Sequence, residues 1–131
     1  MDIEAVRKYC LSLPHTTEGI QWGNNLLFRI GRKMFAIVAL DESPVSISFK
    51  CTPEEFAELV EREGIIPAPY LARNNWVLLE NLDVLPRAEL KRLIRNSYDM
   101  VAAKLPKKIR AELGIADENK STRIRRPGKQ R

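Results

Sequence analysis

The side chains with the strongest nucleophilic or metal-binding chemistry are two cysteines and a single histidine. Cys10 falls on the apolar stripe of an expected helix, Cys51 ends an expected strand, and His15 follows a proline in a turn. A metal site needs several His, Cys or carboxylate ligands close together. A Cys–His dyad needs partners that meet in space, and nothing in the local sequence brings these together. We therefore expect two reduced, buried thiols, an exposed histidine, no metal and no cofactor.

The sequence contains neither a Gly-rich phosphate loop nor a nucleophile elbow. One alternative enzyme site remains, formed by Glu18, Lys33 and Lys50, which requires these groups to converge within hydrogen-bond reach. We expect a protein that is not an enzyme.

Cations and one aromatic residue on expected turns and helix ends suit a binding surface. Lys and Arg donate to phosphates, and an exposed Trp can stack on a base. A core position is the alternative for the tryptophan. The candidate nucleic-acid contacts are Arg32, Lys33, Lys50, Arg73, Trp76, Lys107, Lys108 and Arg110.

A second hypothesis is a protein-interaction or small-ligand module. It places a pocket between the sheet and the loop PAPYLAR (67–73), lined by Trp22, Tyr70 and Trp76. It predicts scattered cations, whereas DNA binding predicts clustered ones.

The net charge of +5 is unevenly distributed along the 131 residues. Residues 1–105 carry 13 Lys and Arg against 14 Asp and Glu, whereas residues 106–131 carry 9 against 3. The segment from 115 to 131 has too few apolar residues to offset the cost of ordering its backbone, so we expect a disordered basic arm. Such an arm suits phosphate binding by counterion release, with a solubilising tail as the alternative.

Length and composition predict one domain, residues 1–114, of a type that needs no disulfide to fold. No apolar run reaches the ~18 residues of a spanning helix, and the N-terminus lacks the apolar region of a secretory signal. We expect a cytoplasmic protein without membrane contact, with a monomer as the default state.

Periodicity and turn signals predict an α+β fold of order α-β-β-β-α-β-α-α, an antiparallel sheet with helices on one face. Short turns between the first three strands exclude parallel pairing. The expected helices span 2–13, 53–63, 86–104 and 106–113, and the expected strands span 26–30, 34–40, 45–50 and 76–80. The segments 15–23 and 65–75 read as turn-rich and irregular.

Several motifs in order along residues 1–114 resemble the MmcQ/YjbR-like family, formerly a domain of unknown function. They are CLSLPHTTE, QWG, GRKMFA, SFKCTPEEF, PAPYLAR followed by Trp76, and SYDMVAAKLPKKIRAEL. The resemblance implies a compact α+β fold similar to frataxin-like and secretion-chaperone-like folds. It also implies DNA binding through a double wing, with the hairpin at 31–33 as one wing and the PAPYLAR loop as the second contact. It supplies no catalytic residues.

Overall fold

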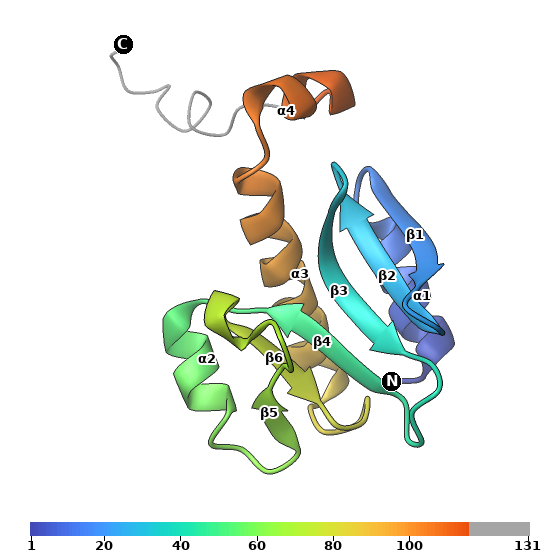
Figure 1. Ribbon diagram of the computed structural model, residues 1–131, viewed down its shortest axis with the longest axis vertical. Helices are drawn as coiled ribbons and strands as arrows, with labels where there is room; N and C mark the ends of the chain where they lie inside the picture. The colour runs from blue at the N-terminus through green and yellow to red at the C-terminus, as the bar shows by residue number, and fades with distance from the viewer. Residues whose placement is uncertain (116–131) are drawn as a thin grey trace.

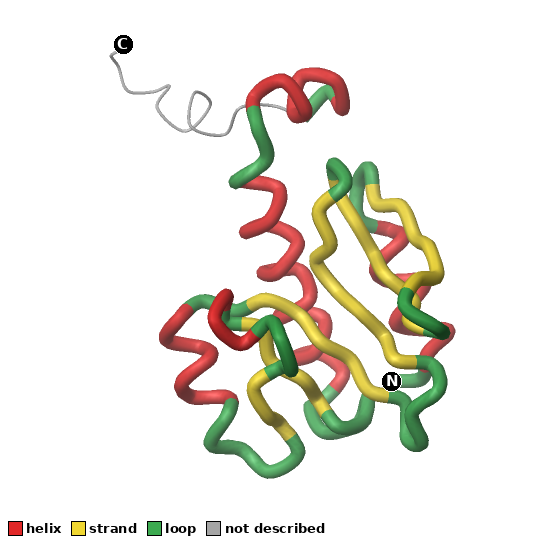
Figure 2. Tube along the Cα trace, viewed as in Figure 1, coloured by secondary structure: helices red, strands yellow, loops and turns green. Residues whose placement is uncertain are grey.

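A computed structural model describes residues 1–115, and these form an α+β fold in which a six-stranded antiparallel sheet carries its helices on one face (Figures 1 and 2). The sheet order is β1-β2-β3-β4-β6-β5. The strands are β1 (Thr16–Gln21), β2 (Asn25–Ile30), β3 (Lys33–Ala39), β4 (Ser46–Lys50), β5 (Ile65–Pro67) and β6 (Trp76–Leu79). The helices are α1 (Ile3–Ser12), α2 (Pro53–Leu59), the short 3-10 helix η1 (Ala72–Asn74), α3 (Arg87–Ala103) and α4 (Lys107–Leu113). The predicted fold class is confirmed.

Helix α3 is the central packing element, because its apolar face lies on the middle strands. Leu90, Leu93 and Ile94 are buried in the core. Its Tyr98 ring meets Phe35 of β3 edge-on, with ring centroids 5.3 Å apart. An alternating apolar face of the sheet and a 3.6-residue stripe on the helix therefore bury each other.

The helices α1 and α2 flank α3 on the same face of the sheet. Lys91 of α3 lies over the Tyr9 ring of α1, 5.5 Å from its centroid. On the other side, Arg92 of α3 pairs with Glu55 of α2 at 3.4 Å. The helix α2 starts at a capping box in which the Glu55 N–H donates to the Thr52 hydroxyl oxygen at 3.1 Å. This box satisfies donors that a helix start otherwise leaves unpaired.

Two edge strands lie in segments that the sequence pattern assigns to turns. Strand β1 buries none of its residues fully, so it lacks the apolar alternation that marks a half-buried strand. Strand β5 is three residues long and contains Pro67, which an edge strand tolerates because one side of it has no partner. Both strands exist because a neighbouring strand offers free backbone groups, a signal that is not local in sequence.

The other predicted elements are confirmed, with small shifts at their ends. The largest shift is in α2, which ends at Leu59 instead of 63. No helix within residues 1–115 is long and apolar enough to cross a membrane. The predicted arm, apart from residue 115, lies outside the described residues.

Candidate nucleic-acid interface

The tip of the β2–β3 hairpin is held against the junction of α3 and α4. Its two turn residues, Gly31 and Arg32, have φ values of 57° and 73°, the pattern of a two-residue type I′ turn. A Cβ on Gly31 would lie 2.8 Å from Leu105 Cδ1 and 2.9 Å from Ile109 Cγ2. Glycine is therefore required here both for its backbone conformation and for the space. The hairpin tip therefore does not project freely as a wing, because it packs against Leu105 and Ile109 at the junction of α3 and α4.

The helix α4 lies beside this hairpin tip (Figure 1). Its Ile109 and Leu113 pack against the core, and Lys107 and Lys108 are exposed. Gly114 ends the helix in the left-handed conformation at φ 74°. The apolar residues of α4 therefore fix the helix in place, which leaves its cations on the surface.

The half-buried Lys50 lies at the end of β4 and has no carboxylate partner within residues 1–115. Burial, together with repulsion from Lys104 at the end of α3, lowers the pKa of Lys50 below its ordinary value. The backbone at Lys50 is joined to α3 and β3, because the buried Ser97 hydroxyl accepts from the Lys50 N–H at 3.0 Å and donates to the Phe35 carbonyl at 2.7 Å. A desolvated cation without a counter-charge is a candidate anion contact.

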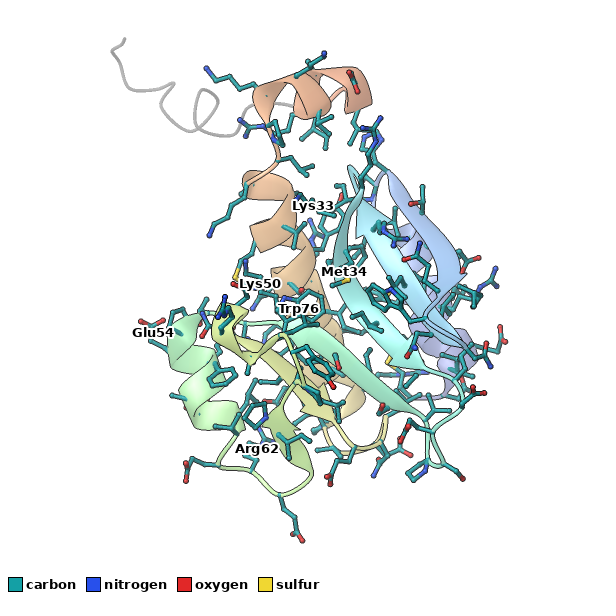
Figure 3. The ribbon with its side chains drawn as sticks, viewed as in Figure 1. Lys33, Met34, Lys50, Glu54, Arg62 and Trp76 are labelled. Atoms are coloured by element: carbon teal, nitrogen blue, oxygen red, sulfur yellow. The ribbon has the colours of Figure 1, made fainter. Side chains whose placement is uncertain are left out.

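Cations gather at one end of the sheet. At the α4 end lie seven cations from four elements, which we call the basic end. It consists of Arg32, Lys33, Lys50, Lys104, Lys107, Lys108 and Arg110. Figure 3 labels two of them, Lys33 and Lys50. Strand register and connections place acidic residues beyond the opposite ends of β3, β5 and β6. They are Asp41, Glu42, Glu63, Glu80 and Asp83. The basic end also has acidic residues near it, Glu54 at the start of α2 and Glu112 on α4.

Ion pairing separates the basic end from most of the other arginines. Within residues 1–115, none of its seven cations has an acidic group within 4.0 Å. By contrast, four arginines elsewhere are paired. These are Arg7 with Glu18, Arg62 with Glu89, Arg92 with Glu55 and Glu89, and Arg95 with Asp99. The fold thus neutralises those four arginines and leaves the cations of the basic end unpaired.

The structure brings six of the eight candidate contacts to the basic end and adds Lys104. Lys104 looks like an ordinary cation in the last turn of a helix, which the helix dipole favours, so the sequence pattern does not single it out. Arg73 is exposed on η1 in the loop before β6. This loop lies at the same end of the sheet, because its Asn75 carbonyl accepts from the N–H of Cys51, the residue after Lys50, at 2.8 Å.

The expectation that Trp76 stacks on a base is wrong for this structure. Its side chain is only 5% exposed, so the ring is not available to a ligand. The register places it opposite Lys50 on β4, within the sheet. Tyr70, fully exposed in the loop that carries Arg73, is the aromatic residue that remains accessible there.

The alternative pocket of Trp22, Tyr70 and Trp76 is not formed. Trp22 lies in the β1–β2 turn and Tyr70 follows β5, and β1 and β5 are the two edges of the sheet. Five strand spacings separate these edges, about 24 Å along the sheet at ~4.8 Å each. The two residues also lie at opposite ends of their strands, so no shared concavity brings them together.

The enzyme alternative lacks convergence as well. Two hydrogen bonds from Arg7, at 2.6 and 2.9 Å, hold Glu18 and lower its pKa. Glu18 lies on β1 and Lys50 on β4, three strands away, about 14 Å at ~4.8 Å per strand. Burial raises the pKa of Cys10 and of Cys51 to about 12, which keeps both thiols protonated. Within residues 1–115 no three His, Cys, Asp or Glu side chains form a metal-binding group.

Comparison with known proteins adds a family and a fold. The YjbR family model matches residues 11–100, which excludes Lys104 and α4. A crystal structure of a Deinococcus radiodurans protein with a DUF419 domain has a TM-score of 0.78 and 30% identity, covering 88% of this chain and 89% of that one. A Pseudomonas syringae protein has a TM-score of 0.65 and 20% identity over 77% of this chain and 99% of that one, a likeness of fold alone. No curated protein matches the chain.

Proposed function

The chain belongs to the YjbR family, and from the arrangement of its unpaired cations we propose that it is a cytoplasmic, non-enzymatic module that binds DNA at its basic end. The observation that carries this proposal is a cluster of seven cations from four elements, none of which has an acidic group within 4.0 Å in residues 1–115. Residues 1–105 have a net charge of −1. The attraction to a polyanion therefore depends on the local clustering of cations and not on net charge.

Binding at this end is electrostatic and independent of base sequence. Lys and Arg contacts to phosphates release condensed counterions, and this release supplies most of non-specific affinity. The half-buried Lys50 gains most from a phosphate, because its ammonium has already lost part of its water and faces Lys104. Arg73 and the exposed Tyr70 extend the surface toward the β5 edge, where Tyr70 can stack on an unpaired base.

Salt dependence of duplex binding tests the proposal. The affinity of the full chain for a fluorescent 20-base-pair duplex is measured by anisotropy between 50 and 200 mM salt. If five of the seven cations contact phosphates, log K falls with log salt at a slope of about −4.5. Replacing Lys107, Lys108 and Arg110 with Ala removes three contacts and makes the slope shallower by about 2.7.

A matched control variant removes the same number of positive charges near the N-terminal end of α3, away from the basic end. Lys8, Arg87 and Lys91 are also unpaired within residues 1–115, and their replacement with Ala leaves the slope unchanged. Equal losses from both triple variants would mean that net charge alone drives binding. Residues 116–131 contain six Lys and Arg. If replacing those six with Gln abolishes binding while the α4 triple variant binds normally, the basic end is not the interface.

A further inference from the structure

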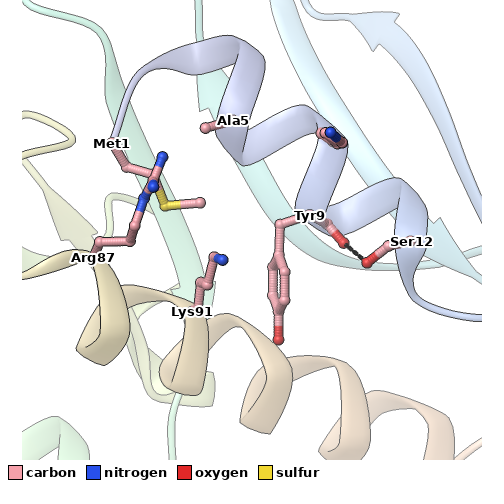
Figure 4. A pocket seen from close by; sticks show the side chains of 7 residues that line it. Met1, Ala5, Tyr9, Ser12, Arg87 and Lys91 are labelled. Atoms are coloured by element: carbon pink, nitrogen blue, oxygen red, sulfur yellow. Dashed lines mark hydrogen bonds between the residues drawn. The ribbon is translucent and has the colours of Figure 1, made fainter.

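A pocket of about 340 Å³ lies between α1 and α3, away from the basic end (Figure 4). Met1, Ala5, Lys8, Tyr9 and Ser12 line it from the N-terminal side, and Arg87 and Lys91 line it from α3. The volume falls at the lower end of the range for small-molecule sites. In the close view, the side chains of Arg87, Lys91 and Tyr9 extend into the space between the two helices.

Three of the lining residues are cations without an acidic partner. No Asp or Glu within residues 1–115 comes within 4.0 Å of the charged atoms of Lys8, Arg87 or Lys91. The other two cations within α3, Arg92 and Arg95, are by contrast paired with carboxylates. The uncompensated charge is thus confined to the side of α3 that faces α1.

The position of these cations is unfavourable for the fold by itself. Arg87 and Lys91 are four residues apart on one helix, where like charges repel. Arg87 is also the first residue of α3, where the helix dipole disfavours positive charge. Lys91 is half-buried and is held over the Tyr9 ring at 5.5 Å from its centroid. A bound anion would relieve both repulsions.

We propose that this pocket binds a small molecule that carries a phosphate group. A guanidinium and two ammonium groups suit a phosphate, whose charge of −1.5 to −2 at neutral pH balances them better than one carboxylate would. The Tyr9 ring, with Met1 and Ala5, offers an apolar surface for the organic part of such a ligand. Arg87 and Lys104 are 17 residues apart on α3 and its C-terminal cap, about 25 Å at 1.5 Å per residue, so the pocket is separate from the basic end.

Calorimetry and thermal unfolding of the full chain test the site, with inorganic pyrophosphate and adenosine monophosphate as probes and uncharged adenosine as their control. We expect saturable binding of both phosphates and a rise in the unfolding temperature. The triple variant Lys8→Met, Arg87→Gln, Lys91→Met should lose at least tenfold in affinity for both. Its unfolding temperature without ligand should stay close to that of the wild type, because the loss of the Lys91–Tyr9 contact is offset by relief of the repulsion between unpaired cations.

The control variant Lys107→Met, Lys108→Met, Arg110→Gln carries the same loss of three charges at the basic end and should bind both probes as the wild type does. Absence of binding at millimolar probe in low salt would overturn the proposal. Equal weakening in both variants would also overturn it, because that result would indicate a general attraction of anions. Unchanged binding in the pocket triple variant would overturn it as well. The test is independent of DNA binding, which the pocket triple variant should retain.

Discussion

Replacing Gly31 with Ala tests whether the hairpin tip holds α4 in place. The substitution has two costs that can be separated. A non-glycine residue at φ 57° costs about 1–2 kcal/mol from its left-handed backbone alone. The new Cβ would also lie 2.8 Å from Leu105 Cδ1 and 2.9 Å from Ile109 Cγ2, and overpacking of this kind costs about 1–3 kcal/mol.

Gly23 provides a matched control, since its φ is 88° and a Cβ there would meet nothing within 4 Å. The Gly23→Ala variant therefore has only the backbone cost. In urea unfolding at 25 °C, Gly31→Ala should lose about 1–3 kcal/mol more than Gly23→Ala. A chain of this size should show the difference as about 3–6 °C in unfolding temperature per kcal/mol.

The same comparison applies to the binding surface. Because the clash acts on the α3–α4 junction, Gly31→Ala should also displace the α4 cations and lower the affinity for duplex DNA, whereas Gly23→Ala should not. A double variant with Leu105→Ala should show a coupling energy, because it removes the nearest clashing atom. Equal destabilisation of the two glycine variants, with no such coupling, would refute the contact between the hairpin and the junction.

Three further predictions concern groups that hold the fold together. Ser97→Ala leaves two strand groups without their hydrogen bonds at a fully buried site and should cost about 1–3 kcal/mol in urea unfolding; a loss below measurement error would contradict the bridging role. Cys10 and Cys51, whose burial raises their pKa to about 12, should react with iodoacetamide at pH 8 only as fast as the chain unfolds, and rapid labelling of native protein would contradict their burial. The Arg7 pairing lowers the pKa of Glu18, so its contribution to stability is present above the unfolded-state pKa of about 4.3 and is lost as pH falls through the lower folded value. Glu18→Gln should therefore flatten unfolding temperature against pH between about 5 and 3, and identical profiles would show that the pair contributes nothing.

Local sequence signals are sufficient for most of the regular elements. The capping box at Thr52, the apolar stripe of α3 and the alternation along β4 each lie within a few residues, and each predicts its element correctly. The strands β1 and β5 are missed because their stability comes from the free edge of a neighbouring strand. An edge strand needs no apolar alternation, so the sequence pattern of these residues does not predict a strand.

The candidate site depended more strongly on the tertiary structure. The sequence identifies most of the cations by type and places them on turns and helix ends, but it assigns the excess positive charge to the C-terminal segment. Only the fold shows that Lys50 and Lys104 approach each other, that Trp76 is buried and that Trp22 and Tyr70 lie at opposite edges.

For this protein, sequence alone determined the α+β class, most of the elements and the resemblance to its family, because hydrophobic periodicity and turn chemistry act over a few residues. The tertiary structure decided which cations share a surface and which are neutralised. Ion pairs such as Arg7–Glu18 and Arg62–Glu89 join residues 11 and 27 positions apart, and the sheet order decides which turns meet. The interaction between charges depends on their distance in space, and the number of residues between them in the sequence does not give that distance.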